Sequence, residues 1–421
     1  MSVPVHPAEP SAPSPFPISQ VEFIAMMALI MAMQALAIDA MLPALGHIAA
    51  DMGVSDPNRR QLVVGLFLLG TGLASLIPGS LADKYGRRRV LLVSITCYVV
   101  FGFACALATE FNTLLVLRVL QALGCSGLIV MPNAIVRDRY SGDTMARISS
   151  TISMVFMVVP ILAPSLGQLV LLFAGWRWIF ALLGILGTVM GLWVWLRLPE
   201  TLRPEYRQEI RPMAIAGNML IAAKTRTSIG YVIGSALVTG SLFGFINSAQ
   251  QLLAEHFGAG ETFPLLFAGC ALTMAIANFT NSRIVEKFGT RRVSHTAVLL
   301  FIATSVVQVL LAHQPHQTLW QFVPLMAANM CLIGFIGANF GAIGLQPFAK
   351  IAGAAASLQA FTRMVLGGLI GIIIGQSYDG TARPLALALL ICGSLSLALV
   401  LFSERGVLFR RLNPRSPSAN G

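Results

Sequence analysis

Three charged side chains lie inside long apolar runs of this sequence, and their types suggest proton and charge chemistry. Asp39, Arg118 and Arg363 each stand among mainly apolar neighbours. A charge at the centre of a bilayer costs at least about 2.5 to 3.5 kcal/mol, so such residues usually have a function or a partner. A buried carboxyl group can bind and release a proton, and a guanidinium can balance its charge or bind an anion.

Other chemistries lack the residues that they need. The six cysteines all fall in apolar runs without a C-x-x-C pair, which is typical of small buried hydrophobic residues. His313 and His316 stand in a loop without matching cysteine or carboxylate ligands, so we expect no metal site. The sequence has no G-x-x-x-x-G-K-[ST] phosphate loop, so energy would come from an ion gradient rather than from a nucleotide. We therefore expect no cofactor, and a proton gradient as the driving force.

The composition places these residues in a membrane protein. Of the 421 residues, 56% are hydrophobic and only 11% are charged, whereas soluble domains carry about 25% charged residues. A spanning helix needs about 20 mainly apolar residues. Twelve such runs cover residues 20–45, 61–82, 90–109, 113–134, 148–173, 178–197, 228–254, 264–286, 293–312, 319–346, 351–376 and 383–403. They are too long and continuous for the strands of a β-barrel, so we expect an all-α integral membrane protein with twelve transmembrane helices.

The distribution of positive charge predicts the orientation. Loops after even-numbered runs, together with the C-terminal tail, hold most of the 28 Lys and Arg residues. Positive residues are retained in the cytoplasm during insertion, so both termini should be cytoplasmic. The net charge of +11 follows from this arrangement and from attraction to lipid headgroups, and no nucleic-acid-binding motif accompanies it. We expect a multi-pass protein of a bacterial inner membrane that contacts lipid and no nucleic acid.

An internal repeat divides the chain into two halves. The stretch from Gly79 to Val90 aligns with the stretch from Ser282 to Val293, which lies 203 residues later, with Lys, Gly, two Arg and Val identical. Two six-helix halves that rock around a midplane site suit an alternating-access carrier. The expected organisation is a flexible cytoplasmic tail (1–17), a six-helix bundle (18–198), a cytoplasmic linker (199–227), a second six-helix bundle (228–405) and a cytoplasmic tail (406–421).

Four motifs resemble signatures of the major facilitator superfamily. The loop from Gly79 to Arg88 is similar to its loop signature, and the stretch from Leu117 to Gly124 is similar to its fourth-helix signature. The stretch from Pro160 to Gly167 resembles the fifth-helix antiporter motif, with Ala163 in place of the usual glycine. Residues 38–45 and 198–202 resemble the bicyclomycin-resistance/chloramphenicol-efflux branch of drug:proton antiporters.

This resemblance covers nearly the whole chain and implies the major facilitator fold, with two pseudo-symmetric bundles. It also implies a proton-coupled exporter of small amphipathic compounds with a broad, multidrug range, which is not an enzyme. We expect the protein to be a monomer. A dedicated metabolite exporter or importer is one alternative. A passive channel or a substrate-sensing receptor on the same scaffold is another.

Asp39 is the expected proton carrier. At a rise of 1.5 Å per residue, Asp39 and Arg118 both lie ~7 to 9 Å below the same surface, and the resemblance permits a contact between them. Burial would favour the neutral acid and Arg118 the carboxylate, so the protonation of Asp39 could switch in the working pH range. Alternatively, Asp39 satisfies a backbone freed by Pro43, and Arg118 is a structural counter-ion. Met31 stands where some members of the branch have a second acid, which implies a single-acid site.

Two further groups of residues are candidates for function. Polar or adaptable side chains could line a substrate cavity, although they also suit helix packing: Gln34, Met31, Asn247, Gln250, Asn278, Asn339, Gln359 and Arg363. The loop signature could form a cytoplasmic latch that is stable in one carrier state, although positive-inside charge explains part of it: Gly79, Asp83, Gly86, Arg87, Arg88, Arg137 and Asp138. Pro160, Pro164 and Gly167 could bend the fifth span as a gating device or as a passive feature.

Overall fold

The chain folds into a bundle of long apolar helices. We describe a computed structural model that covers residues 18–202, 205, 212–348 and 351–410. Within these residues, eleven helices are long and apolar enough to cross a membrane, and a pair of helices bent by 43° supplies a twelfth span. All of the regular structure in the same residues is helical, which confirms the expected fold class. The expected tail 1–17, and the part of the C-terminal tail after residue 410, lie outside the described residues.

The first half contains the spans that precede the predicted linker. Its elements are α1 (Gln20–Asp39), η1 (Leu42–Ala44), α2 (Leu45–Asp51), η2 (Arg59–Gln61), α3 (Leu62–Ala74), α4 (Leu76–Tyr85), α5 (Arg87–Leu107), α6 (Phe111–Arg139), α7 (Gly142–Phe173) and α8 (Arg177–Arg197). Each long helix here coincides with one of the predicted apolar runs, as expected for spans selected by length and hydrophobicity.

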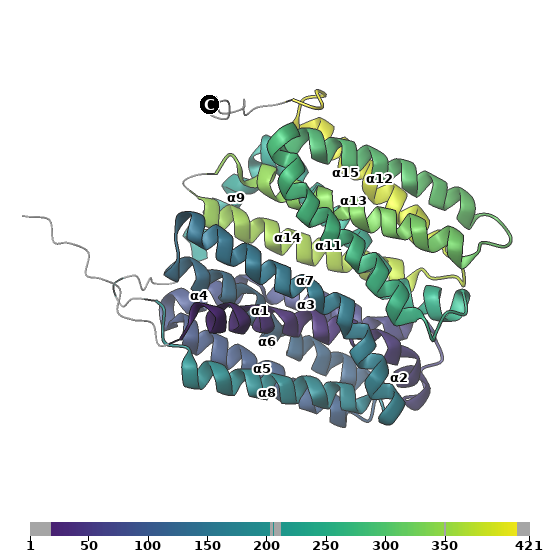
Figure 1. Ribbon diagram of the computed structural model, residues 1–421, viewed down its shortest axis with the longest axis horizontal. Coiled ribbons are helices and arrows are strands. Elements are labelled where there is room, and N and C mark those ends of the chain that lie inside the picture. The colour runs from purple at the N-terminus through teal and green to yellow at the C-terminus, as the bar shows by residue number, and fades with distance from the viewer. Residues whose placement is uncertain (1–17, 203–204, 206–211, 349–350, 411–421) are drawn as a thin grey trace, which may run out of the picture.

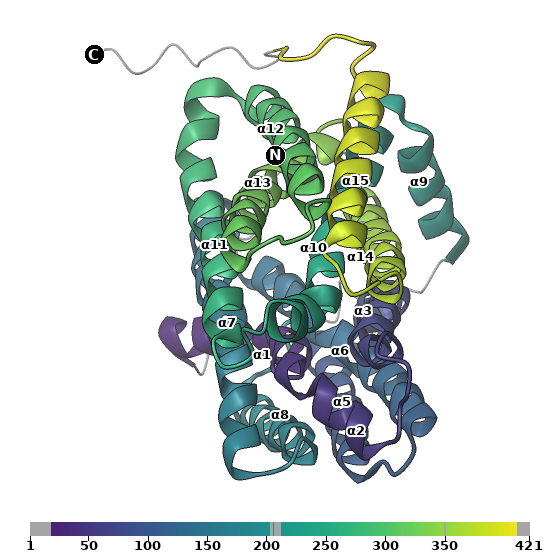
Figure 2. The same cartoon turned by 90° about the vertical axis from the view of Figure 1, so that its right-hand side faces the viewer.

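The second half repeats this plan after a short additional helix. The elements are α9 (Pro212–Lys224), α10 (Arg226–Ala249), the π-helical turn η4 (Gln250–His256), α11 (Phe263–Phe288), α12 (Thr290–Ala312), α13 (Leu319–Leu345), α14 (Ala352–Gln376) and α15 (Arg383–Ser403). Helix α9 falls within the predicted linker and packs on the outside of α14 and α10 (Figure 2).

The two halves lie against each other along two helix pairs (Figure 1). Helix α3 packs against α14, and α7 packs against α11. A side chain at Gly72 of α3 would place its Cβ 2.9 Å from the Cβ of Met364 and 3.0 Å from the backbone of α14. Small residues allow membrane helices to approach closely, which explains glycine at this contact.

The first span, Gln20–Asp51, contains the predicted apolar run over 20–45, but its α-helix is interrupted within that run. Helix α1 ends at Asp39, and a short 3-10 turn and α2 follow. The physical reason is Pro43, which has no N–H to donate to the carbonyl of Asp39 four residues earlier. The second span is bent by 43° between α3 and α4, where Pro78 cannot donate to the carbonyl of Ala74.

The two ends of the bundle differ in charge and in the contacts that they make. The arginine-rich end carries Gly86 and Gly289 between spans, with Arg87–Arg89 and Arg291–Arg292 beside them. The Asn58 end carries the loop before η2, the turn η4 and the loop after α14. By the positive-inside rule, the arginine-rich end is expected to face the cytoplasm.

Hydrogen bonds join the two halves at the Asn58 end. The Asn58 Nδ2 donates to the carbonyls of Gln376 (3.1 Å) and Tyr378 (2.8 Å), and its Oδ1 accepts from Gln251 Nε2 (2.9 Å). Arg60 forms an ion pair of 2.5 Å with Glu255 across the same boundary. These contacts close the Asn58 end in this conformation.

Replacing Asn58 with alanine should loosen this closure. The change removes three side-chain hydrogen bonds between the halves, each with a net worth of about 0.5 to 1.5 kcal/mol. We expect the population opened at the Asn58 end to rise at least about tenfold, measured as a distance distribution between spin labels on the two halves. Asn112→Ala is the control, because Asn112 accepts from Arg59 within the first half. Unchanged distances in Asn58→Ala would contradict the assignment.

Candidate proton-coupling site

Asp39 is a buried acid at the break in the first span. Asp39 is 4% exposed, and its Oδ1 has no hydrogen-bond partner among the described residues. An unpaired carboxylate in such a position would cost several kcal/mol, whereas a neutral acid is much easier to bury. The geometry around Asp39 therefore suits the protonated form.

Arg118 ties three helices together beside Asp39. Its Nη2 donates to the carbonyl of Ala37 (2.9 Å), its Nε to the carbonyl of Val63 (3.0 Å) and its Nη1 to Gln121 Oε1 (2.8 Å). The guanidinium lies over the ring of Phe67, with its carbon 4.1 Å from the ring centroid. Arg118 therefore connects α1, α3 and α6 while it is fully buried.

The bond to Ala37 has a specific structural reason. The last four carbonyls of a helix lack intrahelical partners, and Ala37 is one of the last four residues of α1. The positive charge of Arg118 also interacts favourably with the negative end of the α1 helix dipole. Arg118 thus satisfies the broken end of the first span.

The structure does not form the ion pair that the resemblance permits between Asp39 and Arg118. The donors of Arg118 are directed to two backbone carbonyls and a glutamine instead, which is why no carboxylate is needed for its burial. The two residues are still neighbours, because Arg118 holds the backbone two positions before Asp39. Their functional roles remain predictions.

Gly167 of the antiporter-like motif packs directly on this break. A Cβ at Gly167 would lie 2.1 Å from the carbonyl oxygen of Ala40, which follows Asp39 in the chain. Only glycine permits so close an approach of α7 to the backbone of α1. Helix α7 continues through Pro160 and Pro164 to reach this contact. The fifth span therefore touches the backbone beside the acid.

The substrate-cavity candidates are distributed over several helix contacts. Asn247, Asn278 and Asn339 each donate to the carbonyl four residues earlier in the same helix. Gln250 Nε2 donates to Glu255 at the Asn58 end (3.0 Å), and the Gln359 amide lies next to Gly341 and Gly344 between α14 and α13. Most of these amides are therefore placed as groups that pack helices.

The other three candidates lie on α14 and α1. Arg363 is half-buried on α14, and Gln34 and Met31 are half-buried on α1. Within the described part of the chain, neither Arg363 nor Gln34 has a hydrogen bond or an ion pair from its side chain. These two polar groups are available to a solute.

The loop signature forms a charged cluster within the first half, which we call the Arg87 cluster: Arg87, Asp83, Asp138 and Glu200. Arg87 pairs with Asp83 (2.6 Å) and with Asp138 (2.9 Å), and its backbone N–H donates to Glu200 (2.7 Å). Arg88 donates to the Trp195 carbonyl (2.5 Å). Gly79 packs toward α6, whereas Arg137 is exposed outside the cluster.

Replacing Gly86 with alanine should disrupt the Arg87 cluster. Gly86 has φ +101°, and an added Cβ would lie 2.3 Å from the Glu200 Oε2. Loss of the Glu200 contact should lower the free energy of unfolding by about 2 kcal/mol, and with it the melting temperature. It should also change the distance between α4 and α5. Gly406→Ala is the matched control, because Gly406 also has a positive φ (+79°) but nothing within 4 Å. Equal melting temperatures for both variants would contradict this role of Gly86.

A second buried polar cluster, which was not predicted from the sequence, lies at the arginine-rich end. The Tyr231 hydroxyl donates to Glu404 Oε1 (2.7 Å) and lies 3.0 Å from His295 Nε2, and Arg291 donates to the same Glu404 oxygen (2.6 Å). The backbone N–H of Phe409 donates to His295 Nδ1 (3.0 Å). This cluster ties α10, α12 and α15 to the segment that follows α15. The repeat of Arg88 at Arg291 was the available signal.

In the part of the chain that the structure describes, eleven apolar helices and one bent pair form two packed halves, with a buried acid where α1 ends, an arrangement typical of a membrane transporter rather than an enzyme. The Major Facilitator Superfamily family model matches residues 27–372. The chain belongs to this superfamily.

Relatives within the family carry names of drug resistance. The chain is 27% identical to the bicyclomycin resistance protein homolog of Haemophilus influenzae, over 85% of this chain and 90% of the relative. It is 30% identical to a chloramphenicol resistance protein of Pseudomonas aeruginosa, over 86% of each chain. It is 28% identical to the multidrug resistance protein MdtL of Escherichia coli, over 88% of this chain and 92% of the relative. The resemblance to this branch is confirmed.

Solved structures confirm the fold. The xylose transporter XylE of Escherichia coli in a partially occluded inward-open conformation superposes with a TM-score of 0.69, at 12% identity, over 92% of this chain and 98% of that chain. A bacterial homolog of the human lysosomal transporter Spinster superposes with a TM-score of 0.67, at 17% identity, over 94% and 97%.

Proposed function

We propose that this protein exports small amphipathic compounds in exchange for protons, by alternating access. The names of its relatives support drug-like substrates such as bicyclomycin and chloramphenicol. Asp39 is the proposed proton carrier, and Arg118 the residue that positions and tunes it. The proposal places the protein in a bacterial inner membrane as a monomer, with the arginine-rich end and both termini in the cytoplasm.

The observation that carries this proposal is the burial of Asp39 at the end of α1, where the helix of the first span is interrupted. The acid is enclosed and suits the protonated form here. Release of its proton requires a second conformation in which water reaches it. The interruption between α1 and α2 gives the first span a point at which these two helices can move relative to each other, because Pro43 cannot donate to the carbonyl of Asp39. Proton binding and helix position are thereby linked.

The coupling follows from competition between two arrangements. A protonated Asp39 is stable in the enclosed position, whereas a charged Asp39 favours an opened arrangement with water or a cation near it. A bound substrate that prefers the opened arrangement would displace the proton. Arg363 and Gln34 are the proposed polar contacts for the substrate, because their side chains are free to bind it.

Transport by the purified protein in vesicles tests the proposal. With the vesicle interior acidic, we expect uphill accumulation of labelled chloramphenicol or bicyclomycin, which stops when an ionophore collapses the pH gradient. Each substrate should also cause proton release from the vesicles. Flux that only follows the concentration gradient of the solute would indicate a channel and overturn the proposal. Transport of neither compound, together with proton-driven transport of a metabolite, would overturn the drug-export assignment.

A further inference from the structure

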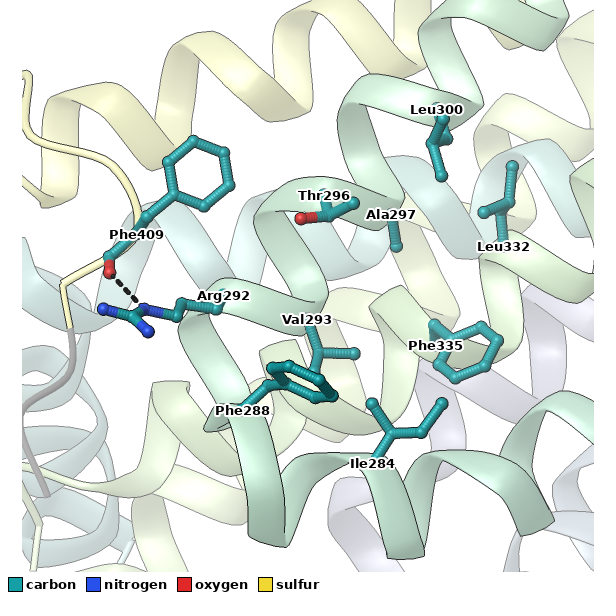
Figure 3. Close-up of a pocket in the computed structure, with 10 residues that line it drawn as sticks. All are labelled: Ile284, Phe288, Arg292, Val293, Thr296, Ala297, Leu300, Leu332, Phe335 and Phe409. Carbon is teal, nitrogen blue, oxygen red and sulfur yellow. Dashed lines mark hydrogen bonds between the residues drawn. The ribbon is translucent and has the colours of Figure 1, made fainter. Parts of the chain in front are cut away.

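Two cavities on the outside of the bundle occupy equivalent positions in the two halves. The first has a volume of about 550 Å³ and lies between α4, α5 and α6. The second has a volume of about 640 Å³ and lies between α11, α12 and α13 (Figure 3). Both volumes fall in the range of about 300 to 1,000 Å³ that is typical of ligand sites. Neither cavity includes the residues assigned to proton coupling.

The linings of the two cavities correspond residue by residue. Tyr85, Arg89, Val90 and Val93 line the first cavity, and the residues 203 positions later line the second: Phe288, Arg292, Val293 and Thr296. The same relation places an aromatic ring and an arginine at each site. The duplication has therefore kept a cavity and its basic residue in both halves.

Both cavities are open to the hydrocarbon region. Val93 at the first cavity is 68% exposed, and Leu300 at the second is 51% exposed. Exposed apolar side chains on membrane-spanning helices contact lipid tails. Their walls are almost entirely apolar, as an acyl chain requires.

At the arginine-rich end, one arginine lines each cavity and one lysine lies near an aromatic ring of the same lining. Arg89 and Lys84 are exposed at the first site, and Arg292 and Lys287 at the second. The ammonium of Lys84 lies 5.2 Å from the centroid of the Tyr85 ring, and that of Lys287 lies 5.5 Å from the centroid of the Phe288 ring. Within the residues that the structure describes, no carboxylate pairs with these four side chains. Their charge is available to an anion.

We propose that each cavity binds one anionic phospholipid, with an acyl chain in the apolar cavity and the phosphate at the Arg–Lys pair. The arginine-rich end is the expected cytoplasmic side, where basic residues meet anionic headgroups. The site combines an apolar wall, a lipid-facing opening and a basic Arg–Lys pair, and a lipid is the ligand that has all three complementary features.

The two sites differ in their cover. At the second site, Arg292 Nε donates to the carbonyl of Phe409 (3.1 Å), and the Phe409 ring lines the cavity (Figure 3). At the first site, Arg89 has no such bond within the described part of the chain. The first site should therefore exchange lipid faster than the second.

Native mass spectrometry of the full-length protein with added phosphatidylglycerol or phosphatidylcholine tests this proposal. We expect two retained phosphatidylglycerol molecules on the unmodified protein. One should remain in Lys84→Gln/Arg89→Gln, one in Lys287→Gln/Arg292→Gln, and none in the fourfold variant. The affinity of each altered site should fall at least about tenfold. Arg147→Gln, at an exposed position of the same end outside both cavities, should keep two.

A second pair of variants tests the acyl-chain part of the site. Val93→Phe and Thr296→Phe should fill the first and second cavity and each remove one bound lipid, while the Arg–Lys pair is unchanged. Melting temperatures of all variants, measured without added lipid, show that they are folded. Three outcomes would overturn the proposal: equal retention of phosphatidylcholine, full retention in the fourfold variant, or displacement of phosphatidylglycerol by millimolar inorganic phosphate.

Discussion

Replacing Asp39 with asparagine should abolish proton-linked efflux while the protein still inserts and folds. The amide has nearly the same shape and is uncharged, so it fits the enclosed position where Asp39 has no ionic partner. It cannot exchange a proton in the working pH range. We expect uphill accumulation of substrate in acid-loaded vesicles to fall by at least about two orders of magnitude, and substrate-dependent proton release to disappear.

Two variants control for this result. Asp39→Glu keeps a titratable acid and should retain part of the proton-linked transport. Glu110→Gln makes the same acid-to-amide change at an exposed loop position and should transport normally. Downhill exchange of labelled for unlabelled substrate should survive in Asp39→Asn, which shows that binding is intact. Undiminished proton release by Asp39→Asn would refute the proposed carrier.

Replacing Arg118 with leucine should cause the largest loss of stability of any single change in the site. The carbonyl of Ala37 would lose its side-chain donor in a buried position, and Gln121 would lose its partner. The cost should be about 3 kcal/mol or more, because buried polar groups left unpaired are expensive. The measurement is the melting temperature of the purified protein, together with the transport rate.

Arg118→Lys and a double variant separate the structural role of Arg118 from its electrostatic role. Lysine keeps the charge but lacks the planar fork that reaches two carbonyls and Gln121, so we expect it to recover only part of the stability. If Arg118 mainly ties helices together, Asp39→Asn will not relieve the instability of Arg118→Leu. Full recovery of stability in the double variant would show instead that Arg118 stabilises the protein by balancing the charge of Asp39.

The spans could be predicted from the sequence because membrane helices follow from length and hydrophobicity. The run over 383–403 matches α15, and the run over 319–346 matches α13 to within one residue. The run over 20–45 lies within the span Gln20–Asp51, but the interruption of its helix after Asp39 was not predicted, because Pro43 leaves the apolar composition unchanged. The charge partners within the loop signature could be predicted in part, since Asp83 and Arg87 are neighbours on adjacent helix ends.

The contacts between distant segments could not be predicted. Asn58 binds the backbone of residues 376 and 378, and Arg60 pairs with Glu255. These contacts join loops and turns, which carry no periodic pattern to reveal their partners. Arg118 shows the same limit, because its hydrogen bonds to Ala37 and Val63 use backbone atoms that every residue has. The sequence can place a buried charge in a helix, but the fold decides which atoms satisfy it.

Asp39 is the last residue of α1, and this position affects how many different substrates could be exchanged for the proton of one acid. If the first span moves at this point during transport, as proposed, a compound that contacts either α1 or α2 would shift the backbone that carries the carboxyl group, without any direct bond to that group. Chemically unrelated compounds would then each be exchanged for the same proton, provided that each of them contacts this interrupted span.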